Sequence, residues 1–234
     1  MTEGIGKALA SAIKDEPQPS SESRSGQTFQ NQHRRSIFSL LTLNPCIGIA
    51  ELAEKCALAP NSVEWHVGAL MKAGYIVKHG TGRRRVFFPE GLITHERAGL
   101  FQAINHPRNS ALLAIVMKKS GLSQTEIAAE LGKSRQWVAK ALNELEAAGV
   151  VSVVSEGNNL RHYPTRLLPD MGDNFYMHSK DFSEYMLKQL AREGGRPPVI
   201  VKKSLSRAVI EAGHATNRFS LEIGINPYMT CLSC

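Results

Sequence analysis

The sequence predicts a mainly α-helical fold with small β-hairpins, arranged as two tandem copies of one unit plus a small α/β C-terminal extension. Two observations predict it. Shifted by 75 residues, the chain matches itself without a gap from Ile37 to Pro89, so that Glu51 aligns with Glu126 and Pro89 with Pro164. Within each copy, apolar residues at helical spacing are followed by two short alternating runs around a Gly-rich turn.

Each unit is expected to hold three helices and a hairpin. In the second copy the middle helix opens with Ser123-Gln-Thr-Glu126, a capping box in which two side chains satisfy free N–H groups of the helix start. The third helix starts at Pro60 in the first copy and behind the cap Ser134 in the second. The hairpin strands are predicted at 75–78 and 85–88, and at 150–153 and 160–163.

The chain is expected to divide into five segments. The residues before the first unit are Ser-, Gln- and Pro-rich and predict a disordered tail. Between the units, Thr94 to Asn105 is helical in pattern and stops before Pro107, which predicts a rigid linker. The segments are 1–33 (tail), 34–92 (first unit), 93–107 (linker), 108–168 (second unit) and 169–234 (C-terminal extension).

The C-terminal extension is harder to interpret. Pro169 and Gly172 break the pattern over 167–174, and an amphipathic helix is predicted from Asp181 to Glu193. We then expect a strand at 199–201, a helix at 204–212 and a strand at 219–225. A piece of this size buries little apolar surface alone, so it should dock on a repeat, on the preceding helix or on a second subunit.

Charge favours a polyanionic partner. The net charge is +7, and residues 34–165 hold 16 basic against 10 acidic groups, so the excess lies in the repeats. No run of 18 apolar residues occurs, which predicts no membrane span, and four scattered cysteines fit a reducing cytoplasm. The sequence contains no Gly-rich phosphate loop, paired acid and base or nucleophile elbow, so we expect no enzyme, no cofactor and no metal. The less favoured alternative is that Cys46 or His214 completes a metal or thiol sensor with Cys231 and Cys234.

A helix, a helix–turn–helix and a hairpin together form a winged helix-turn-helix. The stretches "NSVEWHVGALMKAGYIV" and "SQTEIAAELGKSRQWVAKALNELEAAGVV" resemble the cores of ArsR/MarR-type transcription regulators, and two copies resemble archaeal regulators with tandem winged helices. The resemblance covers roughly residues 35–165. It implies that the third helix enters the major groove of double-stranded DNA, while the wing contacts the backbone or minor groove.

The resemblance places candidate DNA-binding residues on both third helices and both wings. Arg and Lys suit guanine acceptors, and Gln and Asn suit adenine, so the second copy has the richer third helix and the first copy the more charged wing. Trp65 could instead be a packing contact, and the three adjacent arginines could be a solvated run that guards a hairpin edge. The candidates are Asn61, Trp65, Arg83, Arg84, Arg85, Ser134, Arg135, Gln136, Lys140, Asn143 and Arg161.

The resemblance indicates a cytoplasmic DNA-binding transcription regulator. In such regulators an added helix often dimerises, so we expect a homodimer through Phe182, Tyr185, Met186 and Leu190; packing back on the same chain is nearly as good an interpretation. A small effector would bind at the C-terminal extension. The alternative function is a protein-interaction module, as in tandem winged-helix proteins of basal transcription or chromosome-associated complexes.

Overall fold

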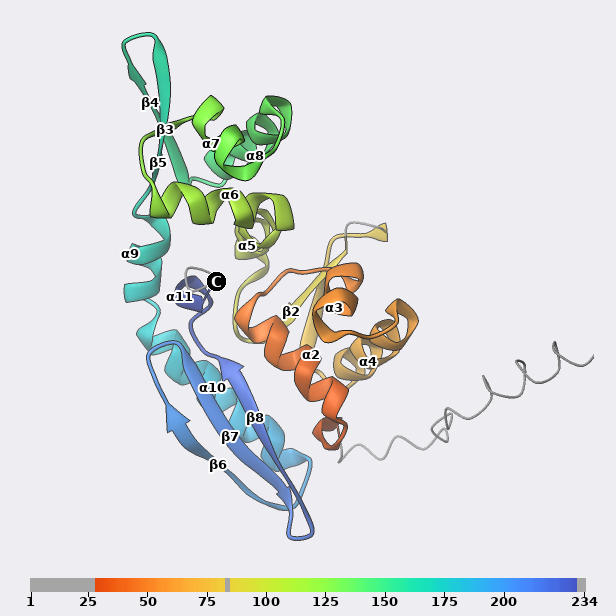
Figure 1. Ribbon diagram of the computed structural model, residues 1–234. Coiled ribbons are helices and arrows are strands. Elements are labelled where there is room, and N and C mark those ends of the chain that lie inside the picture. Colours follow the sequence, from red (N-terminus) through yellow and green to blue (C-terminus); the bar gives the residue numbers. More distant parts are fainter. Residues whose placement is uncertain (1–27, 83–84, 231–234) are drawn as a thin grey trace, which may run out of the picture.

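The computed structural model describes residues 28–82 and 85–230. Figure 1 shows two small helical domains, one above the other, each with its own hairpin. A three-stranded sheet with a long helix along one side lies below the second domain and beside the first. Contacts between segments far apart in the sequence therefore shape the lower half of the molecule.

The 75-residue repeat extends to the bounds of the helices. In the first domain, α2 (Gln32–Leu43), α3 (Ile49–Cys56) and α4 (Pro60–Lys72) precede the hairpin of β1 (Ile76–His79) and β2 (Val86–Pro89). In the second, α6 (Pro107–Lys118), α7 (Gln124–Leu131) and α8 (Arg135–Ala147) have those same bounds shifted by 75. The second hairpin is longer, with β4 (Val151–Glu156) and β5 (Asn159–Pro164), and β5 also pairs with the short β3 (Leu122–Ser123).

The predicted helix signals are present in the structure. The capping box joins Ser123 N to Glu126 Oε2 at 2.7 Å and Glu126 N to Ser123 Oγ at 3.3 Å, and Ser134 Oγ accepts from Trp137 N at 3.2 Å. Gly74 and Gly149, which follow the third helices, have φ values of 77° and 74°. These glycines end the helices because the left-handed conformation costs them little.

The linker between the domains is helical, as predicted. A 3-10 turn, η3 (His95–Arg97), leads into α5 (Ala98–Asn105), whose Phe101 is fully buried. Asn105 ends the helix and donates from Nδ2 to the Pro45 carbonyl at 2.6 Å, so the linker is tied back to the first domain. It is a packed spacer and not a loose tether.

The C-terminal extension differs from the prediction in two places. The predicted helix at 204–212 is wrong: a three-stranded antiparallel sheet of β6 (Arg196–Lys203), β7 (Arg207–His214) and β8 (Asn217–Gly224) occupies this part of the chain. Ala208 and Ile210 point into the core while Arg207 and Glu211 are exposed, a period of two that fits a strand. The predicted break at 167–174 is also wrong, because α9 (Leu167–Asp173) accommodates Pro169 in its first turn, where no helical N–H partner is lost.

The long helix starts earlier than predicted, and the folded chain starts before the predicted tail ends. Helix α10 runs over Tyr176–Arg192, and α11 (Pro227–Thr230) follows the sheet. At the other end, η1 (Thr28–Gln30) falls within the predicted tail, yet Phe29 has no exposed surface. Phe29 packs against Phe38 and Tyr75 at ring distances of 5.1 and 4.5 Å. Because these partners come from other elements, the sequence around residue 29 did not show that this residue would be ordered.

The extension docks on the first domain and on α10, as two of the predicted alternatives stated. Helix α2 lies along β8, with Gly224 N donating to Thr42 Oγ1 at 2.9 Å and Ser39 Oγ donating to the Glu222 carbonyl at 2.5 Å. A Cβ on Gly224 would lie 2.5 Å from the Thr42 carbonyl oxygen, so only glycine permits this approach. The first domain therefore shares its core with residues from the far end of the chain.

Candidate nucleic-acid interface

The third helix of the second domain, α8, presents an exposed polar face. Its predicted reading residues are all exposed: Arg135, Gln136, Lys140 and Asn143. In the described part of the chain, no side-chain hydrogen bond or ion pair engages any of them. Ser134, the cap of α8, is also exposed. Two cations and two amides are thus free to meet a ligand.

Helix α8 is held in place by Glu144, which lies one turn after Lys140 and borders the polar face. Glu144 accepts from Arg108 Nη2 at 2.6 Å and from Asn109 Nδ2 at 2.8 Å, and both partners lie at the start of α6. Burial alone would raise the pKa of Glu144, but the hydrogen bonds from Asn109 and Arg108 and the charge of Arg108 lower it. Because Asn109 also bonds to the Ala103 carbonyl at 2.9 Å, α8 is fixed to both α6 and the linker helix.

The third helix of the first domain, α4, presents a face whose charges are already engaged. Trp65 is 47% exposed and lies under the Arg34 guanidinium, 5.0 Å from ring centre to carbon. Glu64, next to it, forms an ion pair with Arg85 of the wing. Asn61 is exposed. Arg34 was not among the predicted site residues, although it lies in the polar start of α2, where its position could have suggested a surface cation.

A histidine behind this face is buried and neutral. His66 is 5% exposed, and its Nδ1 has no hydrogen-bond partner within the described residues. Burial, with the nearby charges of His33 and Arg34, lowers the pKa of His66 to about 4. His66 therefore contributes to packing behind α4 and carries no charge near neutral pH.

The two wings differ from what their arginines suggested. Arg83 and Arg84 lie outside the described residues, and Arg85 is held by Glu64. In the second wing, Arg161 bonds to Glu126 Oε2 at 2.7 Å and to the Gly121 carbonyl at 3.1 Å. Arg161 thus braces its own domain, and the sequence did not show that the capping-box glutamate would meet it.

The second wing projects from the top of the molecule (Figure 1). Val153 is 44% exposed, Val154 46% and Leu160 58%. The hairpin has one ladder from Val151↔Pro164 to Glu156↔Asn159, with few buried positions. This surface is more apolar than a phosphate-binding wing requires.

Of the four side chains predicted to contact a second subunit, three are buried within the chain and Tyr185 is half-buried. Phe182, Met186 and Leu190 of α10 have exposed fractions of 1%, 0% and 3%. Tyr185 lies over Gly91 and donates from its hydroxyl to the Gly74 carbonyl at 3.2 Å. A second subunit could use this face only by displacing the chain's own sheet and first domain.

The described chain gives no support to a metal or thiol sensor. Over residues 28–82 and 85–230, no group of three or more His, Cys, Asp or Glu side chains is arranged to hold a metal ion. Cys46 is buried, and burial raises the pKa of its thiol to about 12, which disfavours the reactive thiolate. Cys231 and Cys234 lie outside the described residues. No helix in the described ranges has the length and apolar character needed to cross a bilayer.

Comparison with known proteins identifies the repeated unit. A family model for winged helix-turn-helix DNA-binding domains matches residues 30–77 and 108–152, which are the α2–β1 and α6–β4 segments. Each of the two repeats therefore matches the model of winged helix-turn-helix DNA-binding domains. The ArsR/MarR subtype stays a prediction.

One curated relative and two solved structures describe the similarity of longer segments. An uncharacterized HTH-type transcriptional regulator of Methanocaldococcus jannaschii is 25% identical over 133 residues, which are 57% of this chain. The matched segment spans 33% of that relative. ScpB from Mycobacterium tuberculosis is 14% identical, with 60% of this chain and 94% of that chain covered and a TM-score of 0.25. The DIP2311 protein from Corynebacterium diphtheriae is 14% identical, with 57% and 26% covered and a TM-score of 0.23. TM-scores this low do not support any inference about function.

Proposed function

We propose that the protein is a transcription regulator that reads duplex DNA with its second winged helix and holds the duplex with both. The carrying observation is the exposed face of α8, with its two cations and two amides, on a domain that matches the DNA-binding family model. Side chains of these types make the common contacts with base edges in the major groove. The distant relative, described as a transcriptional regulator, supports the same proposal.

The two domains take different parts in this proposal. On α4, Trp65 and Glu64 already contact Arg34 of α2 and Arg85 of the wing, so the first domain offers fewer free hydrogen-bonding groups to bases. Its contribution is to the DNA backbone, through the wing that carries Arg83, Arg84 and Arg85. Base readout falls to α8, while the first domain adds affinity with little sequence preference.

Selection from a pool of random duplexes, with sequencing of the retained DNA, tests this proposal. We expect an enriched motif for the native protein. Gln136→Ala or Lys140→Ala should relax the preference at one or two base pairs, at a cost of ~1–3 kcal/mol each. Lys188→Ala, on the exposed side of α10, is the matched control and should leave the motif unchanged. If the enriched motif is unchanged in both α8 variants, the assignment of base readout to α8 is wrong.

A second candidate function rests on the apolar surface of the second wing. Val153, Val154 and Leu160 are exposed on a hairpin that projects from the domain, and exposed apolar patches often mark protein contacts. In this alternative the tandem domains form a protein-interaction module that holds DNA weakly or not at all. Uniform weak retention of all duplexes in the selection would favour it over the regulator.

The oligomeric state is a separate part of the proposal. A homodimer would bind two half-sites, as paired DNA-binding domains commonly do. Phe182, Met186 and Leu190 of α10 are buried within the chain, so a dimer contact would lie on another surface. Light scattering of the native protein tests the homodimer directly, and a monomer at micromolar concentration excludes it.

A further inference from the structure

A cleft lies at the junction of the linker and the C-terminal helices, outside both third helices. It has a volume of about 430 Å³, within the range of ordinary small-molecule sites. Its walls come from η3, which connects the two DNA-binding domains, from α9 and α10, which follow the second domain, and from α11. The lining residues are Thr94, Arg97, Leu167, Asp170, Met171, Asn174, Phe175, His178 and Tyr228.

The floor of the cleft is aromatic. The Phe175 ring lies 5.2 Å from the Tyr228 ring in an edge-to-face arrangement, and 4.6 Å from the His178 ring. Tyr228 also packs on Phe101 of the linker helix at 5.0 Å. Because these rings hold one another, the floor offers a preformed apolar surface on which a flat molecule can stack.

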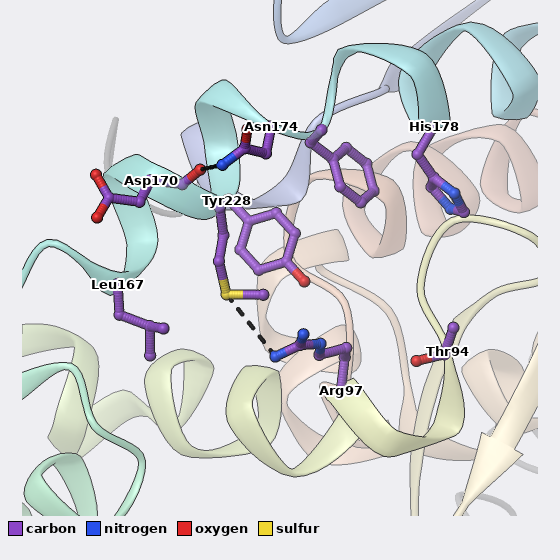
Figure 2. Close-up of a pocket in the computed structure, with 9 residues that line it drawn as sticks. Thr94, Arg97, Leu167, Asp170, Asn174, His178 and Tyr228 are labelled. Atoms are coloured by element: carbon purple, nitrogen blue, oxygen red, sulfur yellow. Dashed lines mark hydrogen bonds between the residues drawn. The ribbon is translucent and has the colours of Figure 1, made fainter.

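One cation faces this floor and has little else to bind. Figure 2 shows Arg97 and Thr94 on the linker side of the cleft, with the Tyr228 ring between them and α9. The only hydrogen-bond partner of the Arg97 side chain among the described residues is the Met171 sulfur, at 3.9 Å. A thioether is a weak acceptor, so the guanidinium keeps most of its donors for another group.

The remaining polar groups do not cancel this charge. Asp170 forms an ion pair with Arg166 at 3.1 Å, and Figure 2 shows its carboxylate turned away from Arg97. His178 Nε2 lies 3.1 Å from the Leu92 carbonyl; because a carbonyl only accepts, that nitrogen carries the proton. Asn174 donates to the backbone carbonyl of Asp170 at 2.8 Å and leaves its amide oxygen as an acceptor.

We propose that this cleft binds a small organic carboxylate with a flat apolar body, and that binding changes the affinity for DNA. A guanidinium pairs with a carboxylate through two parallel hydrogen bonds, while the aromatic floor takes the apolar part. Inorganic phosphate fits less well, because the aromatic floor gives it no apolar partner.

The position of the cleft explains how the ligand would act on DNA binding. Arg97 belongs to the segment that connects the two winged helices. Phe175 lies between α9 and α10, which follow the second winged helix in the chain. A ligand that joins these two walls fixes the domains relative to each other, and DNA must meet both domains at once. This coupling rests on the proposed function, whereas ligand binding itself does not. By linkage, DNA must change the ligand's affinity by the same factor.

Ligand-observed fluorine NMR with para-fluorobenzoate as the probe tests binding without DNA. We expect the probe's signal to broaden at millimolar concentration with the native protein, and the neutral analogue para-fluorobenzamide to give no broadening. Arg97→Gln should weaken probe binding by about tenfold or more, as loss of a charge-assisted pair predicts, and Arg97→Lys should lie between. Arg196→Gln, an exposed cation on β6, is the control and should bind as the native chain does.

Each outcome decides one part of the proposal. If the probe binds Arg97→Gln as well as the native protein, or binds neither, the cleft is not a carboxylate site. Competition by inorganic phosphate as strong as that by benzoate would mean a general anion site and would contradict the role of the floor. If the probe binds at the cleft but duplex affinity stays the same with and without it, the coupling fails. If the protein binds the probe but no duplex, the proposed function is wrong, while the proposal of a carboxylate site in the cleft still stands.

Discussion

The Tyr75 hydroxyl donates a hydrogen bond to Glu193 Oε1 at 2.7 Å across 118 residues of sequence. The second oxygen of the same carboxylate accepts from Thr28 N at 3.1 Å. One side chain at the end of α10 thus joins the start of the folded chain to the first domain. Tyr75 is only 2% exposed, and its burial, together with the negative charge of Glu193, raises the pKa of the phenol. The phenol therefore stays protonated as a donor.

Removal of this hydroxyl should destabilise the protein. Tyr75→Phe leaves the half-buried Glu193 carboxylate without this donor, so we expect the free energy of unfolding to fall by ~1–3 kcal/mol. Urea denaturation measures it. Tyr163→Phe is the matched control: its hydroxyl also meets a glutamate, Glu156 at 2.7 Å, but on an exposed hairpin. An equal loss in both variants would show that burial of the Tyr75 pair contributes nothing.

Acid should destabilise the protein partly through His66. Folding lowers its pKa from 6.5 to about 4, so the unfolded chain binds the proton more readily between these values. The stability from neutral His66 is fully present above pH 6.5 and is lost as the pH falls toward about 4, by up to ~3 kcal/mol. His66→Leu should flatten the acid side of a plot of unfolding free energy against pH.

Part of the acid dependence will remain in that variant, because burial also lowers the pKa values of His106 and His162. His214→Gln, at an exposed position on β7, serves as the control and should keep the native slope. If His66→Leu also keeps the native slope, the histidine behind α4 is protonated in the folded state.

Release of Arg85 should strengthen DNA binding. Glu64→Gln removes a negative charge from the exposed face of α4 and frees the wing arginine that it holds. One more phosphate contact would steepen the fall of log K with log[salt] by ~0.9. Fluorescence anisotropy over a salt series measures the slope. Glu184→Gln, exposed on α10, should leave it unchanged, and a similar effect from both would indicate only a change in net charge.

The three adjacent arginines should set part of the salt dependence. Replacement of Arg83, Arg84 and Arg85 by Ala should lower the salt slope by roughly one to two units, the change expected from the loss of one or two phosphate contacts. Affinity should fall nearly alike for all duplexes while the enriched motif persists. A folded triple variant with an unchanged slope would falsify the wing's role and leave the arginines as a solvated edge guard.

Ala57 has a left-handed backbone conformation, and the equivalent position of the second repeat is a glycine, so the two positions allow a matched pair of substitutions. Ala57 follows α3 with φ 53°, and its equivalent after α7 is Gly132 with φ 61°. An L residue pays for this conformation, so Ala57→Gly should stabilise by about 0.5–1 kcal/mol and Gly132→Ala should destabilise by about 1 kcal/mol. A Cβ on Gly132 would meet nothing within 4 Å, so packing does not confuse the result. Thermal unfolding measures both, and equal signs would contradict the backbone argument.

The sequence predicted the repeated units well because their signals are local. Capping residues, helical spacing and the Ala-Gly ends lie within a few residues of the helix bounds that they determine, and the self-match doubled each observation. The site was harder. Exposure of Gln136 and Lys140 followed from helical spacing, but the pairing of Arg161 with Glu126 depends on how a hairpin packs 35 residues away.

The C-terminal extension could not be predicted because its order comes from distant partners. The pattern at 207–214 fits a strand only when Ile210 is paired with Ile200 and Leu221 on either side, and no short window contains all three. The amphipathic face of α10 was predicted, but a sequence pattern does not show whether an apolar face meets its own chain or another.

The contact between α2 and β8 has a consequence for synthesis of the chain. Thr42 leaves the ribosome long before Gly224, its hydrogen-bond donor 182 residues later. Domains usually fold in the order in which they emerge, but here the first domain lacks part of its core until the last strand is made. The second domain can finish folding first, because its helices contact mainly one another. During translation the amino-terminal domain therefore stays incomplete, because Phe29 and α2 have not yet formed their contacts with β8. This is the stage at which we expect chaperones to bind the nascent chain.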